Sequence, residues 1–252
     1  MDNIMWDSKN YGENFNFVHE YGKEVMNLLE ITEGMTVVDL GCGNGQLTKQ
    51  LADQKVDVYG IDSSEAMLRT AREAYPQIPF LCEDATKFNI GKKVDAIFSN
   101  AVIHWIDDQE GLITNIANQL KVGGQFVCEF GGKGNVESIH AALEREFRKR
   151  GYVYKRGFYF PTIGEYTAKL EAHGLQVRFA TLFDRPTKQE GEDGLANWIR
   201  MFNLLPFQVQ GITQEEQEEI IRIVVEELRP TCYTNGTWYA DYVRIRIKAI
   251  KQ

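Results

Sequence analysis

A glycine-rich turn between a predicted strand and a predicted helix is the feature that most constrains this chain. The stretch TVVDL at 36–40 has the β-branched and aliphatic character of a buried strand, and Gly41, Gly43 and Gly45 follow it at every second position. A helix-forming segment begins at Leu47. Glycines at the carboxyl end of a strand let backbone amides approach a ligand closely, because no Cβ intrudes. The turn is therefore a candidate cofactor cradle.

The spacing of these glycines distinguishes this turn from the turn of a dinucleotide-binding site. Dinucleotide sites use G-x-G-x-x-G, whereas this turn reads G-x-G-x-G, with its last glycine one residue early. The next predicted strand, at 56–61, ends in Asp62, about 20 residues beyond the turn, where an acid can accept both hydroxyls of a ribose. Two further predicted strands also end in polar residues, 78–82 in Glu83-Asp84 and 94–98 in Ser99-Asn100.

Strands and helices alternate along the chain with short links, which predicts parallel strands joined by right-handed crossovers. We therefore expect an α/β fold with a doubly wound, mostly parallel sheet of seven strands, whose ligand lies at the carboxyl ends of the strands. The later strands are predicted at 125–130, 175–183 and 238–250, with helices that begin at 135 and 162 between the first two.

In these residues the chain resembles the class I S-adenosylmethionine-dependent methyltransferases, which have a Rossmann-like fold. The resemblance covers residues 36–130 and implies S-adenosyl-L-methionine as cofactor and S-adenosyl-L-homocysteine as product. It assigns Asp62 to the ribose hydroxyls, and Asp39 to the orientation of the turn and of the cofactor's amino group. The remaining assignments are Gly41, Gly43 and Gly45 to the ribose and methionyl part, Ser63, Met67, Asp84 and Ala85 to the adenine, and Asn100 and Ala101 to the methionyl segment.

The whole chain, 1–252, is expected to form a single domain around a cofactor-binding core at 31–130. Residues 1–30 are expected to form an N-terminal helical cover, because apolar residues recur near helical spacing from Phe17 to Leu29. Trp6, Tyr11 and Phe15 precede that helix. Two interpretations are open: these rings fold over a cationic sulfonium, or they pack the helix onto the sheet.

Some fifty residues separate the last two predicted strands, and we expect them to form a helical lid at 184–237. A polar linker at 184–194 is followed by an amphipathic helix bearing Trp198 and by a second helix that Thr213 caps and Pro230 stops. This insertion, with the motif Ala101-x-x-x-Trp105-Ile106-Asp107-Asp108, is similar to the trans-aconitate 2-methyltransferase-like group, although His104 stands where that group is expected to carry Gln.

The acceptor is expected to be a small molecule, most simply an acid that becomes a methyl ester. A carboxylate is ionised at neutral pH and needs cationic clamps rather than a base. Arg156 and Arg200 are candidate clamps, with Trp6, Trp105, Tyr159 and Tyr233 as pocket walls. Alternatives are an oxygen or carbon of a neutral metabolite, for which His104 is the candidate base, and a cofactor-binding protein without turnover. Each named side chain also has an ordinary packing or surface interpretation.

The net charge, the apolar runs and the cysteines of the chain limit the kinds of partner that we expect. The net charge of −8 argues against broad binding to nucleic acid or to an anionic membrane, and no apolar run reaches the length of a membrane span. Four cysteines without paired spacing favour reduced thiols rather than a metal or disulfide framework. Without a signal-peptide pattern, we expect a cytoplasmic monomer or homodimer with no metal.

Overall fold

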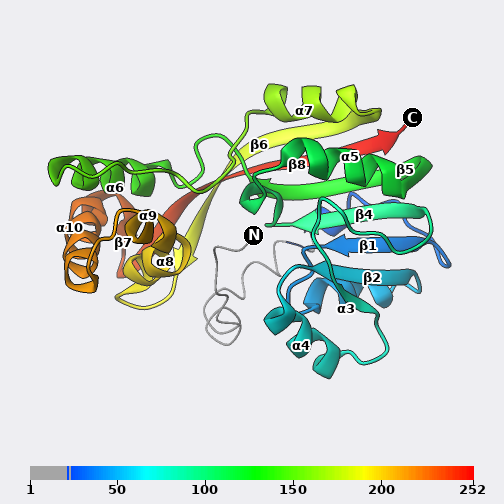
Figure 1. The fold of residues 1–252 in the computed structure, drawn as a ribbon, viewed down its shortest axis with the longest axis horizontal. Helices are drawn as coiled ribbons and strands as arrows, with labels where there is room; N and C mark the ends of the chain where they lie inside the picture. Colours follow the sequence, from blue (N-terminus) through cyan, green and yellow to red (C-terminus); the bar gives the residue numbers. More distant parts are fainter. Residues whose placement is uncertain (1–21, 23) are drawn as a thin grey trace.

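An eight-stranded sheet organises the computed structural model, which describes residue 22 and residues 24–252 (Figure 1). Seven strands lie in the order β3-β2-β1-β4-β5-β8-β6, and the two-residue strand β7 pairs with β8. Strands β1 to β5 run parallel, whereas β8 is antiparallel to β5, β6 and β7. The predicted α/β, mostly parallel sheet is therefore confirmed, and β7 is an addition to the seven predicted strands.

Strand–turn–helix units build the parallel part of the sheet. Their elements are β1 (Thr36–Leu40), α3 (Gln46–Ala52), β2 (Asp57–Asp62), α4 (Glu65–Ala74), β3 (Phe80–Cys82), β4 (Val94–Asn100), η1 (Ile103–Trp105), α5 (Gln109–Gln119) and β5 (Leu120–Gly131). Chain order reverses where β1 lies beside β4, and the carboxyl ends of strands at such a point form the usual ligand crevice of an open α/β sheet.

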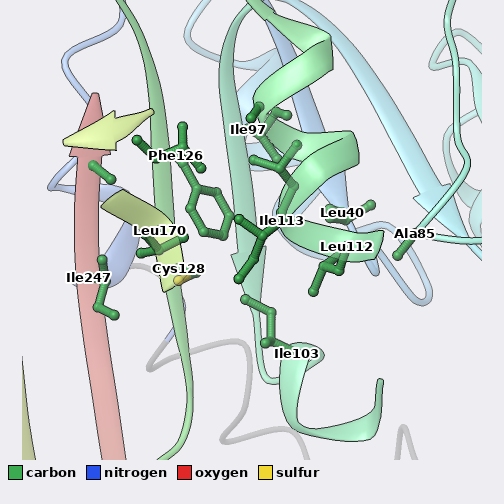
Figure 2. Close-up of a cluster of buried hydrophobic side chains, with 14 of the residues drawn as sticks. Leu40, Ala85, Ile97, Ile103, Leu112, Ile113, Phe126, Cys128, Leu170 and Ile247 are labelled. Atoms are coloured by element: carbon green, nitrogen blue, oxygen red, sulfur yellow. The ribbon is translucent and has the colours of Figure 1, made fainter. Parts of the chain in front are cut away.

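The two faces of the sheet carry separate apolar cores, because successive strand residues point to opposite sides. On one face, Ile97 of β4 packs with Leu112 and Ile113 of α5 and with Leu170 of α7 (Ile163–Ala172), as Figure 2 shows. On the other, the neighbouring Phe98 belongs to a cluster with α3 and the end of the N-terminal helix. Both faces are thus covered, which buries β1 completely.

A second group of helices gathers around the outer halves of two long strands, β6 (Leu175–Gln189) and β8 (Thr237–Lys251) (Figure 1). We call this group the helical lobe. It consists of α6 (Glu137–Lys149), α8 (Gly194–Phe202), α9 (Leu204–Val209), α10 (Gln214–Cys232) and β7 (Tyr233–Thr234). Its apolar cluster includes Trp198 of α8 and Trp238 of β8.

Two sequence expectations about this region are wrong. The predicted linker at 184–194 is largely strand, because β6 continues to Gln189 and pairs there with Trp238. The buried positions of this outer half are Arg185, Thr187 and Gln189, whose polarity hid the alternation of a strand. Pro230 does not stop α10, which continues to Cys232; Pro230 is exposed.

Among the described helices, none combines the length and apolar character needed to cross a bilayer. The expected cover at 1–30 can be followed only from residue 22, where the end of a helix packs Val25, Met26 and Leu29 onto the sheet. Trp6, Tyr11 and Phe15 lie outside the described residues.

Candidate active site

The turn after β1 has the backbone shape that only glycine adopts without strain. Gly41, Gly43 and Gly45 have φ angles of +77°, +54° and +80°. A Cβ on Gly41 would lie 2.1 Å from Val102 Cγ2 and one on Gly45 2.7 Å from Phe80 Cζ, so neither position has room for a side chain. The turn is held to β2 by the Gly41 amide, which donates to the Ile61 carbonyl at 2.7 Å.

Asp62, at the end of β2, is fastened to this turn. One carboxylate oxygen accepts from the Gly43 amide at 2.9 Å and the other from the Ser64 amide at 2.8 Å. Burial raises the pKa of Asp62, and these backbone hydrogen bonds oppose the rise. Ser64 also caps α4 by accepting from the Met67 amide, which places Met67 against Gly43. The structure therefore brings Asp62, Gly43 and Met67 together, with Ser63 between the strand and the cap.

Asp39 lies beneath the turn rather than in it. Its side chain is 2% exposed and accepts from the Thr48 hydroxyl at 2.6 Å. Burial raises the pKa of Asp39 to about 7, the Thr48 hydrogen bond opposes the rise, and the nearby charge of Asp62 adds to it. The site thus holds a carboxyl group that titrates near neutrality next to the candidate cradle.

The ends of β3 and β4 complete the rim. The Glu83 amide donates to the Asp62 carbonyl at 3.0 Å, which places Asp84 and the buried Ala85 beside the end of β2. Asp84 Oδ1 accepts from both the amide and the hydroxyl of Thr86 at 2.7 Å, and these bonds lower its pKa.

At the end of β4, the chain is turned by a strained residue. Ala101 has a φ of +61°, and its amide donates to the Glu129 carbonyl at 2.8 Å. Asn100 stands opposite Glu129 in the sheet register, and a Cβ on Gly22 would lie 3.3 Å from Asn100 Nδ2. Gly22, in the described part of the N-terminal helix, therefore lies beside the residue expected to line the methionyl segment.

Aromatic rings gather beyond the carboxyl end of β4. His104 on η1 lies with its ring centroid 5.4 Å from that of Trp105, and Trp105 lies 4.6 Å from Phe158 and 6.0 Å from Phe202 of α8. We call His104, Trp105, Phe158, Phe160 and Phe202 the aromatic wall. It joins the sheet to the helical lobe.

The bonding of His104 fixes its tautomer. The Gly131 amide donates to His104 Nδ1 at 3.3 Å, so the ring proton resides on Nε2. Burial and the positive charge of Arg244 hold the pKa of His104 well below its usual value. At neutral pH the side chain is therefore an uncharged hydrogen-bond donor.

The residues predicted to bind the acceptor are only partly brought together. Trp105 belongs to the aromatic wall, and the Tyr159 amide donates to the His104 carbonyl at 3.0 Å. In contrast, Arg156 pairs with Glu137 of α6 at 2.7 Å and Arg200 pairs with Glu218 of α10 at 2.6 Å. The ring centroid of Tyr233 lies 4.8 Å from that of Trp238, and the two rings are tilted by 54°. The two predicted clamps and Tyr233 thus have partners within the helical lobe.

Sequence reasoning missed a charged group on the inner strands. Glu129 of β5, which is 2% exposed, accepts hydrogen bonds from Arg185 of β6 and from Arg246 of β8. The available signal was the presence of Glu129 and Arg246 inside stretches predicted as strands, whereas Arg185 lay in the stretch predicted as a linker. Their mutual pairing depends on the order β5-β8-β6, which the sequence does not state.

Comparison with known proteins agrees with this geometry. A family model described as "Methyltransferase domain" matches residues 38–128. The chain is 36% identical to a trans-aconitate 2-methyltransferase from Azoarcus sp. (strain BH72), over 84% of each chain. It is 40% identical to one from Variovorax paradoxus (strain S110), over 73% of this chain and 74% of that one.

A solved structure shares the fold. It belongs to a candidate methyltransferase from Bacillus halodurans C-125 and superposes with a TM-score of 0.67 at 16% identity, covering 92% of this chain and 99% of that one. The cradle also fits the cofactor of this family, because the carboxylate of Asp62, which can accept ribose hydroxyls, is held by the Gly43 amide against a turn that glycines form without strain. The cofactor is S-adenosyl-L-methionine. By relatives, fold and cradle together, the chain belongs to the class I S-adenosylmethionine-dependent methyltransferases.

Proposed function

We propose that this enzyme methylates a carboxylate of a small acid to give a methyl ester. The observation that carries the proposal is the state of His104, whose Nδ1 is occupied by the Gly131 amide and whose pKa lies well below its usual value. A general base needs an available lone pair and a pKa near the working pH. His104 offers neither, which disfavours acceptors that must lose a proton.

A carboxylate requires no such base. Its pKa near 4 keeps it ionised at neutral pH. S-adenosyl-L-methionine supplies a methyl group on a positively charged sulfur, which needs no further activation. The carboxylate oxygen forms the new C–O bond as the C–S bond breaks, the electron pair passes to sulfur, and no proton is exchanged.

The protein's contribution is then to position the reactants and exclude water. Asp62 is the candidate partner of the cofactor's ribose, and Asp39 of its amino group. Asn100 and Ala101 are proposed to border the methionyl segment, and Asp84 and Ala85 the adenine. The aromatic wall covers the adjoining crevice, where His104 Nε2–H is available as a donor to an acceptor oxygen.

The acceptor class is supported by the relatives as well. Two proteins with 36% and 40% identity carry the name trans-aconitate 2-methyltransferase, which describes methylation of a small tricarboxylate. We therefore propose trans-aconitate as the first acceptor to test. The helical lobe is proposed to act as a lid over it.

The test combines cofactor binding with turnover. Titration with S-adenosylhomocysteine is expected to show binding that Asp62→Ala weakens about tenfold or more, because a charged hydrogen-bonding group is lost. Turnover is then measured with trans-aconitate, other small acids and neutral alcohols.

His104→Asn separates the two acceptor classes, because its side-chain oxygen can replace Nδ1 as partner of the Gly131 amide. With a carboxylate acceptor, kcat is expected to stay within about tenfold of wild type, whereas loss of a general base costs about a hundredfold or more. The proposal would be contradicted if the enzyme methylated neutral alcohols but no acid, and if His104→Asn abolished that activity.

A further inference from the structure

A pair of arginines lies beside the candidate active site, one on β8, which pairs with β5, and one on β6, which pairs with β8. Arg185 of β6 and Arg246 of β8 both bind Glu129, with Arg185 Nη2 at 3.1 Å and Arg246 Nε at 2.7 Å from Glu129 Oε2. We call Arg185 and Arg246 the arginine pair. Glu129 in turn stands opposite Asn100, and its carbonyl accepts from the Ala101 amide. The pair is thus tied to the end of β4, where the cofactor's methionyl segment is expected.

The arginine pair is held in a fixed orientation. The side chains of Arg185 and Arg246 are 9% and 15% exposed, and their guanidinium carbons lie 5.0 Å and 5.3 Å from the ring centroid of Phe183. An aromatic face on one side and a buried carboxylate at the edge leave little rotamer freedom. Guanidinium groups held in this way bind a carboxylate with little further loss of entropy.

A carboxylate from the protein itself already lies against the pair. Glu24 Oε2 is 3.2 Å from Arg246 Nη2 and 3.9 Å from Arg185 Nη2. Unlike Glu129, the Glu24 side chain is 65% exposed, so this contact is at an open edge. Glu24 belongs to the same short helical stretch as Gly22, which lies against Asn100. An anion from solution can therefore reach the position that Glu24 takes.

We propose that the arginine pair is a carboxylate-binding site of the active site, and that Glu24 is a built-in competitor which a ligand carboxylate displaces. The inference rests on the proposed function, because two carboxylates take part in that reaction. One belongs to the acid that accepts the methyl group, and the other to the methionyl part of the cofactor. Both present the same chemistry to the pair, and the experiment below separates them.

A second ion pair in the same region provides a matched control. Glu30, also in the N-terminal stretch, lies 2.7 Å from Lys248, two residues beyond Arg246 on β8. Its side chain is 83% exposed. Glu24→Gln and Glu30→Gln remove the same charge from neighbouring pairs, but only the first removes a carboxylate that lies against the arginine pair.

The test compares these two variants in three measurements: KM for the acid acceptor, Kd for S-adenosylhomocysteine, and Kd for 5′-methylthioadenosine, which lacks the amino-acid part. If the acceptor carboxylate binds the pair, Glu24→Gln lowers KM about two- to fivefold, the range of an exposed ion pair. If the cofactor carboxylate binds there, Glu24→Gln lowers Kd for S-adenosylhomocysteine and leaves Kd for 5′-methylthioadenosine unchanged. Glu30→Gln changes none of these values in either case.

Arg246→Gln is expected to act in the opposite direction, weakening the same ligand about tenfold or more because a charge-assisted hydrogen bond is lost. Arg246→Lys keeps the charge beside Glu129 and is expected to recover part of the loss, so it carries the test if the Gln variant does not fold.

The inference is overturned if Glu24→Gln leaves every value unchanged or raises KM and Kd, because Glu24 then only fastens the N-terminal stretch. Failure of the proposed function gives a different result. Wild-type enzyme would then methylate no acid. Its binding of S-adenosylhomocysteine, and the effect of Glu24→Gln on that binding, do not depend on turnover and are measured separately.

Discussion

Among single residues, Asp39 is predicted to make cofactor binding depend on pH. Burial raises its pKa to about 7, so the carboxyl group is mostly protonated at pH 6 and mostly ionised at pH 8. The amino group of S-adenosylhomocysteine is cationic at both values and is better bound by the ionised form. We predict that its affinity rises about five- to tenfold from pH 6 to pH 8, since a single group changes affinity at most tenfold per pH unit below its pKa.

Calorimetric titration across this range checks the prediction. Asp39→Asn is expected to bind more weakly at pH 8 and to show an almost flat profile. A wild-type affinity that does not change with pH would show that Asp39 is not close to the amino group.

His104 gives the opposite expectation for turnover. Its pKa lies well below the usual value for histidine, so it is neutral over the range from pH 7 to pH 8. We predict that kcat with a carboxylate acceptor is flat over that range. A tenfold fall per pH unit toward acid, lost in His104→Asn, would instead assign His104 a proton-transfer role.

The structural elements carry two further predictions, the first at the glycine turn. Gly41 combines a φ of +77° with a Cβ position 2.1 Å from Val102, whereas Gly34 has a φ of +86° and nothing within 4 Å. Gly34→Ala carries only backbone strain, about 1–2 kcal/mol of unfolding free energy. Gly41→Ala adds overpacking and is predicted to cost about 2–5 kcal/mol and to weaken S-adenosylhomocysteine binding. Urea unfolding and titration of both variants measure the difference; equal losses would contradict the steric argument.

The second concerns the helical lobe, where a buried polar chain links α6 to Asn203, the residue between α8 and α9. His140 Nδ1 lies 2.6 Å from the Tyr154 hydroxyl, which donates to Asn203 Oδ1 at 2.9 Å. Burial lowers the pKa of His140 to about 4, so the unfolded chain binds a proton that the folded one excludes between about pH 6.5 and 4. Stability therefore falls as pH decreases through that window, by up to about 3 kcal/mol from this group.

Urea unfolding at pH 7 and pH 4.5 tests this expectation. His140→Gln removes the titrating ring, and its free energy of unfolding should decline less on acidification than that of the wild type. Identical declines would show that other groups account for the acid sensitivity.

What the sequence predicted at the scale of elements depends on how local the signal is. The turn at Gly41 and the acid at Asp62 each lie within one strand–turn–helix stretch, and the structure places Asp62 against the turn. The outer half of β6 was missed because its buried residues are polar. The clamps at Arg156 and Arg200 were proposed without knowledge of Glu137 and Glu218, whose pairing requires the folded lobe.

At the scale of the whole molecule, the main feature is that the sheet and the helical lobe share the strands β6 and β8. The inner halves of β6 and β8 belong to the sheet that carries the cradle, and their outer halves carry the helical lobe (Figure 1). The aromatic wall joins the two, through the contact of Trp105 with Phe202. Substitutions in the helical lobe are therefore expected to affect binding of the acceptor more than binding of the cofactor.

Trp198 provides the last prediction, because it connects the interior of the lobe to the aromatic wall. It is 3% exposed, donates to the Tyr242 hydroxyl at 2.6 Å, and its ring lies 5.2 Å from Phe202. Trp198→Ala is predicted to cost about 3–5 kcal/mol of unfolding free energy and to release Phe202 from its packing. We expect KM for the acid acceptor to rise about tenfold or more, while Kd for S-adenosylhomocysteine stays within about twofold.

Trp198→Phe is the matched variant, since it keeps an aromatic ring against Phe202 and loses only the hydrogen bond and part of the volume. Its KM should lie between those of wild type and Trp198→Ala. Steady-state kinetics and calorimetry on the same preparations separate the two sides of the crevice. If Trp198→Ala weakened binding of the cofactor and of the acceptor equally, the prediction would be contradicted. The lobe would then act on the cradle as well, through the continuous strands β6 and β8 rather than through the aromatic wall.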